Sequence, residues 1–408
     1  MSTHESTFST VTALLPSNRS GDVIDDIIAQ HGASALLWRA RGTVLHDQWW
    51  QRWMPPISPA KTMLQMLVPD EDVSRVIDVV VKKGRLHQQA TGAVFSMPCE
   101  NVYFGSQYHH WPKPESKAES EWSFATEKKL GIIYCMVSQS RSDRVCRAAI
   151  DAGAHGPIVH YCEGRGLRDR LGWLRITKEQ NQEVLIVLAE QQYVEGVFDE
   201  MARVGEFHRP GNGMMYRMPV EHGMVNLPSR VSAHKYDADM QQIIRAIDHL
   251  SGHSHWRDAG QNHSSTHDNS GQETSSIANE LALRDQVRMS AIVRRSEADA
   301  FSDLVLEAGA PGLTVVQTFF SAAEEGCQIA GARVNEEYSL YRSILRPEVA
   351  NRVCGAVKEA AEHQGIDDLC VYTNPVPAVA RYVPGGKEYR APVSPLLTAP
   401  AQEVARET

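Results

Sequence analysis

The sequence predicts an α+β protein in which one βαβ-βαβ unit occurs three times along the chain. Two segments of equal length, HGASALLWRARG (31–42) and HGPIVHYCEGRG (155–166), both begin with His-Gly and end with Arg-Gly. Residues 61–100 align with 182–221 without a gap, which places Gly84 on Gly205, His87 on His208 and Gly92 on Gly213. A fainter copy follows, since AGAPGLTVVQ (308–317) matches AGAHGPIVHY (152–161). Internal repeats of this kind indicate repeated structural units.

The second copy shows the predicted order of elements most clearly. Apolar, β-branched runs predict strands at 130–138, 157–162, 183–190 and 213–221. The segment 142–154 predicts a helix with Ser142 as N-cap and Gly153 as its end signal. The segment 193–205 predicts a second helix, because Val194, Val197, Phe198 and Met201 share one face. The order matches the ferredoxin-like split motif, in which two helices cover one face of a small sheet.

Composition changes set the expected boundaries. The three units are predicted at 8–106, 129–228 and 287–385, the third being the most degenerate. Between the second and third, 237–250 predicts an amphipathic linker helix and 251–279 a flexible Ser/His/Asn/Gly-rich linker. Residues 386–408 are expected to form a C-terminal tail.

Charge and composition exclude several classes of protein. The net charge of −9 argues against a nucleic-acid binder, which would carry a basic surplus. No apolar run approaches the ~20 residues that span a bilayer, and the polar N-terminus lacks a signal-peptide pattern, so we expect a cytoplasmic protein without membrane insertion. The seven scattered cysteines include no C-x-x-C pair and are expected to be reduced.

The segments EGRG (163–166) and GEFHRPGNGMMYRMPV (205–220) resemble PII signal-transduction and PII-like proteins. The resemblance implies ferredoxin-like units that assemble around a three-fold axis and bind adenine nucleotides (ATP, ADP or AMP) between units. Three tandem copies would then close into a pseudo-trimer within one chain. The alternative is self-association across chains into large oligomers or filaments.

The resemblance also supplies the candidate binding residues. Arg41-Gly42 and Gly164-Arg165-Gly166 match the turn at the base of the family's flexible loop, and Arg209, Gly211, Asn212 and Gly213 match its phosphate-cradling turn. Asn212 stands where an acid is usual and Met214 where a lysine is usual, which removes one phosphate ligand. These glycines could equally serve turns that the fold requires. No metal site is expected, because the His-rich tracts lack a regular ligand spacing.

The predicted function is a non-enzymatic sensor. The sequence lacks the G-x-S-x-G, Walker, H-E-x-x-H and dinucleotide motifs of common enzymes. A bound anion would order the loop after Arg165-Gly166 or Arg41-Gly42 and so change affinity for a regulated partner protein. Two alternatives remain open at this point: a structural scaffold that has lost its ligand, and an enzyme that hydrolyses the nucleotide. Trp49, Trp50 and Trp53 are expected to dock on a neighbouring copy, a partner or another chain.

Overall fold

The computed structural model describes residues 7–31, 35–43, 60–88, 91–108, 130–166, 181–227, 282–321, 327–329 and 332–382. The predicted linker helix (237–250), the linker (251–279), the tail (386–408) and the three neighbouring tryptophans lie outside these residues.

The described elements form three consecutive groups. The first group contains β1 (Phe8–Pro16), α1 (Ser20–His31), β2 (Leu36–Gly42), β3 (Ala60–Pro69), the 3-10 turn η2 (Asp70–Asp72), α2 (Val73–Gly84) and β4 (Gly92–Phe104). The second group contains β5 (Leu130–Ser138), α3 (Gln139–Asp151), β6 (Ile158–Gly166), β7 (Asn181–Glu190), α4 (Gln191–Gly205) and β8 (Met214–Pro219), followed by β9 (His222–Asn226). The third group contains β10 (Ala282–Arg294), the 3-10 turn η5 (Arg295–Glu297), α9 (Ala298–Glu307), β11 (Gly312–Ser321), β12 (Cys327–Ile329), β13 (Ala332–Leu345), α10 (Pro347–His363) and β14 (Leu369–Arg381).

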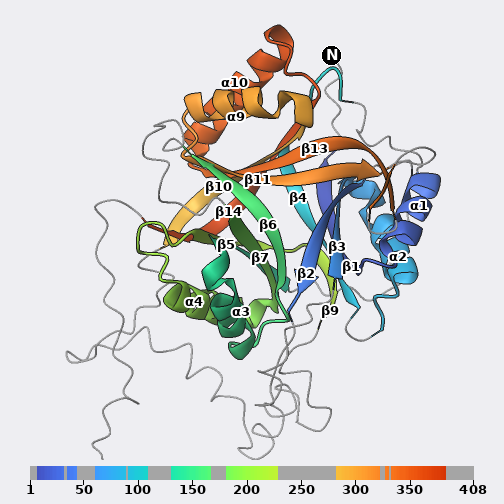
Figure 1. Ribbon diagram of the computed structural model, residues 1–408, viewed down its shortest axis with the longest axis vertical. Coiled ribbons are helices and arrows are strands. Elements are labelled where there is room, and N and C mark those ends of the chain that lie inside the picture. The colour runs from blue at the N-terminus through green and yellow to red at the C-terminus, as the bar shows by residue number, and fades with distance from the viewer. Residues whose placement is uncertain are drawn as a thin grey trace, which may run out of the picture.

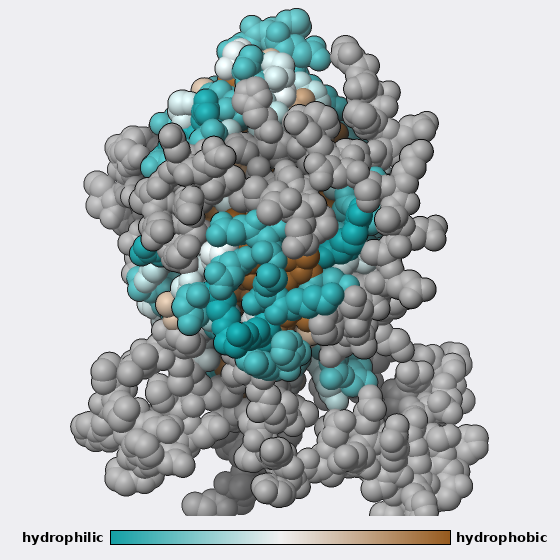
Figure 2. All heavy atoms as spheres, turned by 90° about the vertical axis from the view of Figure 1, so that its right-hand side faces the viewer, coloured by the Kyte–Doolittle hydropathy of each residue, from teal (hydrophilic) through white to brown (hydrophobic). Residues whose placement is uncertain are grey.

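The strands of all three groups belong to one 14-stranded antiparallel sheet, in the order β12-β13-β10-β14-β8-β5-β7-β6-β11-β2-β3-β1-β4-β9. The additional pairings β13–β11, β14–β4 and β6–β2 close this sheet into a β-barrel with extra strands. The three helix pairs lie at separate places around the outside of the strands (Figure 1). The described surface on the side of α1 and α2 is mostly hydrophilic, with one small hydrophobic area among polar side chains (Figure 2).

This architecture corrects the predicted fold class. Tandem ferredoxin-like domains of the PII-like type would each own a separate small sheet, whereas here the edge strands of different groups hydrogen-bond to one another. The physical reason is that an edge strand carries unpaired N–H and C=O groups, which the neighbouring group can satisfy. The prediction of a pseudo-trimer or inter-chain assembly of separate domains is therefore replaced by a single closed barrel.

The barrel has one shared interior and three outer cores. Alternate residues of each strand face opposite sides, so Tyr134 and Met136 of β5 point into the shared interior while Cys135 packs under the helices. The interior also collects Leu14 from the first group and Tyr372 from the third. Because both faces are buried, strands such as β5 have continuous apolar sequences rather than an alternating pattern.

The local predictions in the second group are mostly confirmed. Strand β5 occupies the predicted residues, and all four predicted apolar residues of α4 are buried. Gly153 follows the end of α3 with a positive φ of 99°. Ser142 is not the N-cap, because α3 begins at Gln139 and the Ser142 hydroxyl donates to the Gln139 carbonyl oxygen within the first turn. The cysteines whose side chains are described are free, as expected.

Candidate functional site

A cavity of about 480 Å³ lies where the second group meets the third. One side is the β6–β11 junction, where Gly166 pairs with Gly312 and Gly164 with Thr314. The other side is the β8–β14 junction, where Met214 pairs with Arg381. The lining residues are Met136, Gly164, Arg165, Gly166, Gln182, Val184, Gly211, Gly213, Met214, Tyr216, Pro311, Gly312, Leu313, Thr314, Arg342, Ser343, Ile344, Arg381 and Tyr382.

In the turn before β8, the cavity is lined by two glycines, Gly211 and Gly213, whose backbone is not covered by a side chain. Gly211 and Gly213 have φ angles of +87° and +102°, a region that favours glycine. A Cβ on Gly213 would lie 1.9 Å from the Met136 carbonyl oxygen, so this position has no room for a side chain. A Cβ on Gly211 would meet nothing within 4 Å, so only its backbone conformation requires glycine. Backbone N–H groups in such turns can bind anions.

The cavity lining is positively charged although the whole chain is acidic. It contains Arg165, Arg342 and Arg381, and no Asp, Glu, His, Cys or Lys occurs among its described lining residues. Burial lowers the pKa of Arg381, and the nearby positive charge of Arg346 lowers this pKa further. An anion in the cavity would therefore relieve repulsion at the β14 end.

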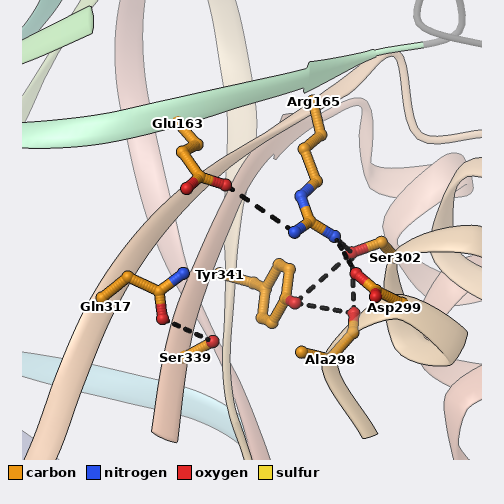
Figure 3. Close-up of polar contacts among 8 residues, drawn as sticks. All are labelled: Glu163, Arg165, Ala298, Asp299, Ser302, Gln317, Ser339 and Tyr341. Carbon is orange, nitrogen blue, oxygen red and sulfur yellow. Dashed lines mark hydrogen bonds and ion pairs between the residues drawn. The ribbon is translucent and has the colours of Figure 1, made fainter. Parts of the chain in front are cut away.

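Arg165 is held across the junction by residues of the third group (Figure 3). Its Nη1 donates to Asp299 Oδ1 at 2.8 Å and to Ser302 Oγ at 2.9 Å, and Nη2 lies 3.7 Å from Glu163 Oε2. Burial lowers the pKa of Arg165, but the bond to Asp299 and the nearby Tyr341, Asp299 and Glu163 together outweigh it and leave the pKa above its usual value. The Asp299 side chain is 91% exposed. Its contact with Arg165 is thus weak enough for a ligand to replace it.

Five of the predicted site residues are brought together here. Gly164, Arg165 and Gly166 from β6 face the same cavity as Gly211 and Gly213. The other two residues of that turn do not line the cavity. Asn212 Nδ2 donates to the Glu206 carbonyl oxygen at 2.9 Å, and Arg209 Nη1 pairs with Glu206 Oε1 at 3.2 Å, so both stabilise the turn.

Arg41 and Gly42 do not belong to this cavity. Arg41 Nη2 donates to Glu183 Oε2 at 3.1 Å, and Gly42 pairs with Ile158 at the β2–β6 junction. Their role in the described structure is to join the first group to the second. Residues 167–180, which include the loop expected to respond to a ligand, lie outside the described residues.

Sequence reasoning missed the residues that the third group contributes, chiefly Arg342, Arg381 and Tyr382. The corresponding segment of the third copy, HQGIDDLC (363–370), contains two acidic residues, which by themselves argue against an anion site in this group. A signal was present, because Arg342 interrupts the apolar strand segment SLYRSIL (339–345). A charged side chain in a buried strand is rarely found without a hydrogen-bonding or ionic partner, so it indicates such a partner or a functional role.

Two further observations bear on the class of protein. No helix in the described ranges is both long and apolar enough to cross a membrane. Within the same residues, no group of three or more His, Cys, Asp or Glu side chains could hold a metal ion.

Comparisons with known proteins supply no family for this chain. No protein-family model matches it, and no curated protein matches it. A solved microcompartment protein from Desulfitobacterium hafniense is 10% identical with a TM-score of 0.16, over 61% of this chain and 95% of that one. An anthrone oxidase-like protein is 12% identical with a TM-score of 0.16, over 57% of this chain and 99% of that one. Similarity at this level supports no conclusion about fold or function.

Proposed function

We propose that the cavity between the second and third groups binds a small organic anion, and that adenine nucleotides are the first class to test. The observation that carries the proposal is the lining, which combines three arginines with two glycine-containing backbone segments and includes no described carboxylate. Arginine forks and exposed backbone N–H groups are the donors that bind phosphate and carboxylate. The volume falls within the range of small-molecule sites.

An exposed aromatic side chain also lines the cavity. Tyr382 is 40% exposed, which is unusual among the large aromatic side chains that the structure describes. An aromatic ring in this position can stack on a purine base while the arginines take the charged end. This combination favours a nucleotide over an inorganic ion alone.

We propose binding rather than catalysis. General acid–base chemistry needs a titratable group beside the reacting atoms, and the described lining residues offer none of the usual carboxylate, imidazole or thiol groups. The proposed role is that of a cytoplasmic sensor, in which the ligand changes the segment after Gly166 and thereby the affinity for a partner protein. A nucleotide-hydrolysis assay with Arg165→Ala as control tests the enzymatic alternative.

A binding experiment tests the proposal directly. ATP, ADP and AMP are titrated calorimetrically into wild type, Arg381→Met and Arg346→Met. Arg346 is an exposed neighbour that does not line the cavity and serves as the matched control. We expect at least one nucleotide to bind, Arg381→Met to weaken binding about tenfold or more, and Arg346→Met to have a smaller effect. Binding of none of the nucleotides by wild type would overturn the nucleotide proposal.

The scaffold alternative stays a prediction that the described structure does not favour. It supposed that bare sheet faces are buried between chains. Here the inner faces of all three groups pack together in one interior within a single chain. Light scattering of the purified full chain distinguishes the two, because a scaffold would give discrete or open-ended multimers.

A further inference from the structure

Two arginines are buried inside the barrel, and one of them, Arg342, is also a lining residue of the cavity. Arg288 of β10 and Arg342 of β13 are 1% and 5% exposed. Their guanidinium carbons lie 5.3 Å and 5.2 Å from the centre of the same ring, that of Tyr134. Two positive charges are thus held close to one aromatic side chain in the protein interior.

The hydrogen-bond partners of these arginines are neutral. Arg288 donates from Nε and Nη2 to Asn374 Oδ1, at 3.2 Å and 2.7 Å. Arg342 donates from Nη2 to Gln65 Oε1 at 2.9 Å. Neither guanidinium forms an ion pair with a carboxylate of the described residues. A guanidinium keeps its proton even when buried, so both charges persist without a counter-ion.

Three donors on this inner face have no hydrogen-bond acceptor. They are Nη1 of Arg288, Nε of Arg342 and the hydroxyl of Ser290. Ser290 stands directly opposite Arg342 in the β10–β13 register, and Arg288 lies two residues away on the same face of β10. Gln286 Oε1, an acceptor on the same face of β10, also has no partner, and the Ser290 hydroxyl can donate or accept. Buried guanidinium N–H groups are normally satisfied, so the unpaired ones of Arg288 and Arg342 indicate an absent acceptor.

The cavity gives an acceptor a route to this place. Arg342 and its neighbour Tyr216 both line the cavity. The partly exposed Tyr382 and the buried Arg342 therefore line the same cavity, whereas Arg288 and Ser290 adjoin Arg342 without being lining residues themselves. We propose that the inner end of the cavity is a subsite for an oxyanion group, bound by Arg342 together with Ser290 and Arg288. This inference deepens the proposed function and rests on it, because both use the same cavity.

The chemistry of the subsite is that of a phosphoryl or carboxylate group. Either oxyanion accepts several hydrogen bonds at once and neutralises guanidinium charge. Charge-assisted bonds of this kind are strong away from water. In the bound state the ligand would fill the missing acceptor positions, while Tyr134 and Gln65 keep the two arginines in place.

The test uses inorganic phosphate and malonate as separate probes on the full chain. Calorimetric titrations compare wild type with Arg342→Met, Ser290→Ala and the control Arg346→Met at constant ionic strength. We expect at least one probe to bind wild type, with affinity about tenfold or more lower in Arg342→Met, about threefold or more lower in Ser290→Ala, and changed less than in either of these in the control. The probe that binds identifies the oxyanion class.

A second measurement guards against a variant that fails to fold. Replacing an unpaired buried charge by an apolar side chain of similar size is often neutral or stabilising, so Arg342→Met should melt at or above the wild-type temperature without added anion. Ser290→Ala, which removes only a hydroxyl, remains informative if Arg342→Met does not fold. Equal probe affinity in wild type and Ser290→Ala, together with equal affinity in a folded Arg342→Met, would falsify the subsite.

The outcomes also separate the subsite from the proposed function. Phosphate binding that depends on Arg342, without binding of any adenine nucleotide, supports the subsite and overturns the nucleotide assignment. Nucleotide binding that is equally tight in wild type and Arg342→Met supports the proposed function and overturns the subsite. Failure of both probes to bind wild type at millimolar concentration overturns the subsite as well.

Discussion

Arg41 and Glu183 form an ion pair across the junction of the first two groups, with 3.1 Å between Nη2 and Oε2. The Glu183 side chain is 1% exposed and that of Arg41 is 31% exposed. A carboxylate this deeply buried depends on its partner for charge compensation. In the described structure Arg41 therefore compensates the charge of the buried Glu183 carboxylate.

Arg41→Met should destabilise the protein, because it leaves the buried Glu183 carboxylate without its partner. Fully buried pairs lose about 3–5 kcal/mol when one partner is removed, and partial exposure of Arg41 lowers the expectation to about 2 kcal/mol. Urea denaturation followed by circular dichroism measures the loss. The double variant Arg41→Met, Glu183→Gln should recover most of it, and a loss that persists in full would contradict the pairing argument.

Glycine substitutions in the turn before β8 should differ in cost. Gly213→Ala combines a positive φ with a Cβ that would lie 1.9 Å from the Met136 carbonyl oxygen, whereas Gly211→Ala has a positive φ and open space. We expect about 1 kcal/mol of destabilisation for Gly211→Ala and at least about 3 kcal/mol for Gly213→Ala. Thermal melts of the two variants side by side provide the measurement, and equal costs would show that the turn can relax.

Asp299→Asn should strengthen anion binding at the outer part of the cavity. The substitution removes the negative charge that engages Arg165 at 2.8 Å. Since an exposed ion pair contributes about 1 kcal/mol or less, the gain in affinity should be about two- to fivefold. Asp303→Asn removes the same charge from the same helix, α9, and is the matched control. A gain of equal size in both variants would indicate a general charge effect.

His160 should make the protein less stable in acid. The pKa of His160 is lowered to about 3, mainly by burial. A bond to the Tyr161 carbonyl oxygen partly opposes this shift, and the charge of Arg342 adds to it. The unfolded chain, with an ordinary pKa of 6.5, binds the extra proton between these values. Stability therefore falls as pH drops from about 6.5 toward 3, by up to about 1.4 kcal/mol per pH unit.

His160→Phe keeps an aromatic ring beside Trp38 and removes the titrating group. The free energy of unfolding, measured in urea at pH 7, 5 and 4, should fall less steeply in this variant than in wild type. Parallel pH profiles would show that the acid sensitivity arises from other groups.

The sequence allowed prediction of local structure but not of how the strand edges meet. The apolar face of α4 and the continuous apolar sequence of β5 are local patterns, and each predicts its element without information from the rest of the chain. The pairing of Gly166 with Gly312 is different, because it depends on which edge of another group lies nearby. Such long-range pairings leave no periodic signal, and this is why separate domains were predicted in place of one barrel.

The equivalent glycines Gly84 and Gly205 end α2 and α4. The left-handed conformation after each helix is adopted by the next residue, Arg85 or Glu206, with φ of 50° and 51°. A Cβ on Gly205 would lie 2.3 Å from the Phe207 ring, so close packing explains this glycine.

For a similar reason, the sequence motifs indicate only some of the residues that the structure brings together at the cavity. The residues of β6 and of the turn before β8 were found because glycine and arginine form recognisable motifs. Arg342 and Arg381 were missed because each is a single charge in an apolar strand, and only the closed sheet brings them to the same cavity.

The pairing of β14 with β4 has a consequence for synthesis of the chain. Phe104 pairs with Cys370, and Tyr103 with Val371. During translation, more than half of the polypeptide is synthesised after β4 before its partner strand β14 emerges. Until then this edge of β4 has unpaired backbone N–H and C=O groups. A nascent chain with an open edge is prone to aggregation, so truncated products and ribosome-stalled intermediates should depend on chaperones far more than the finished protein does.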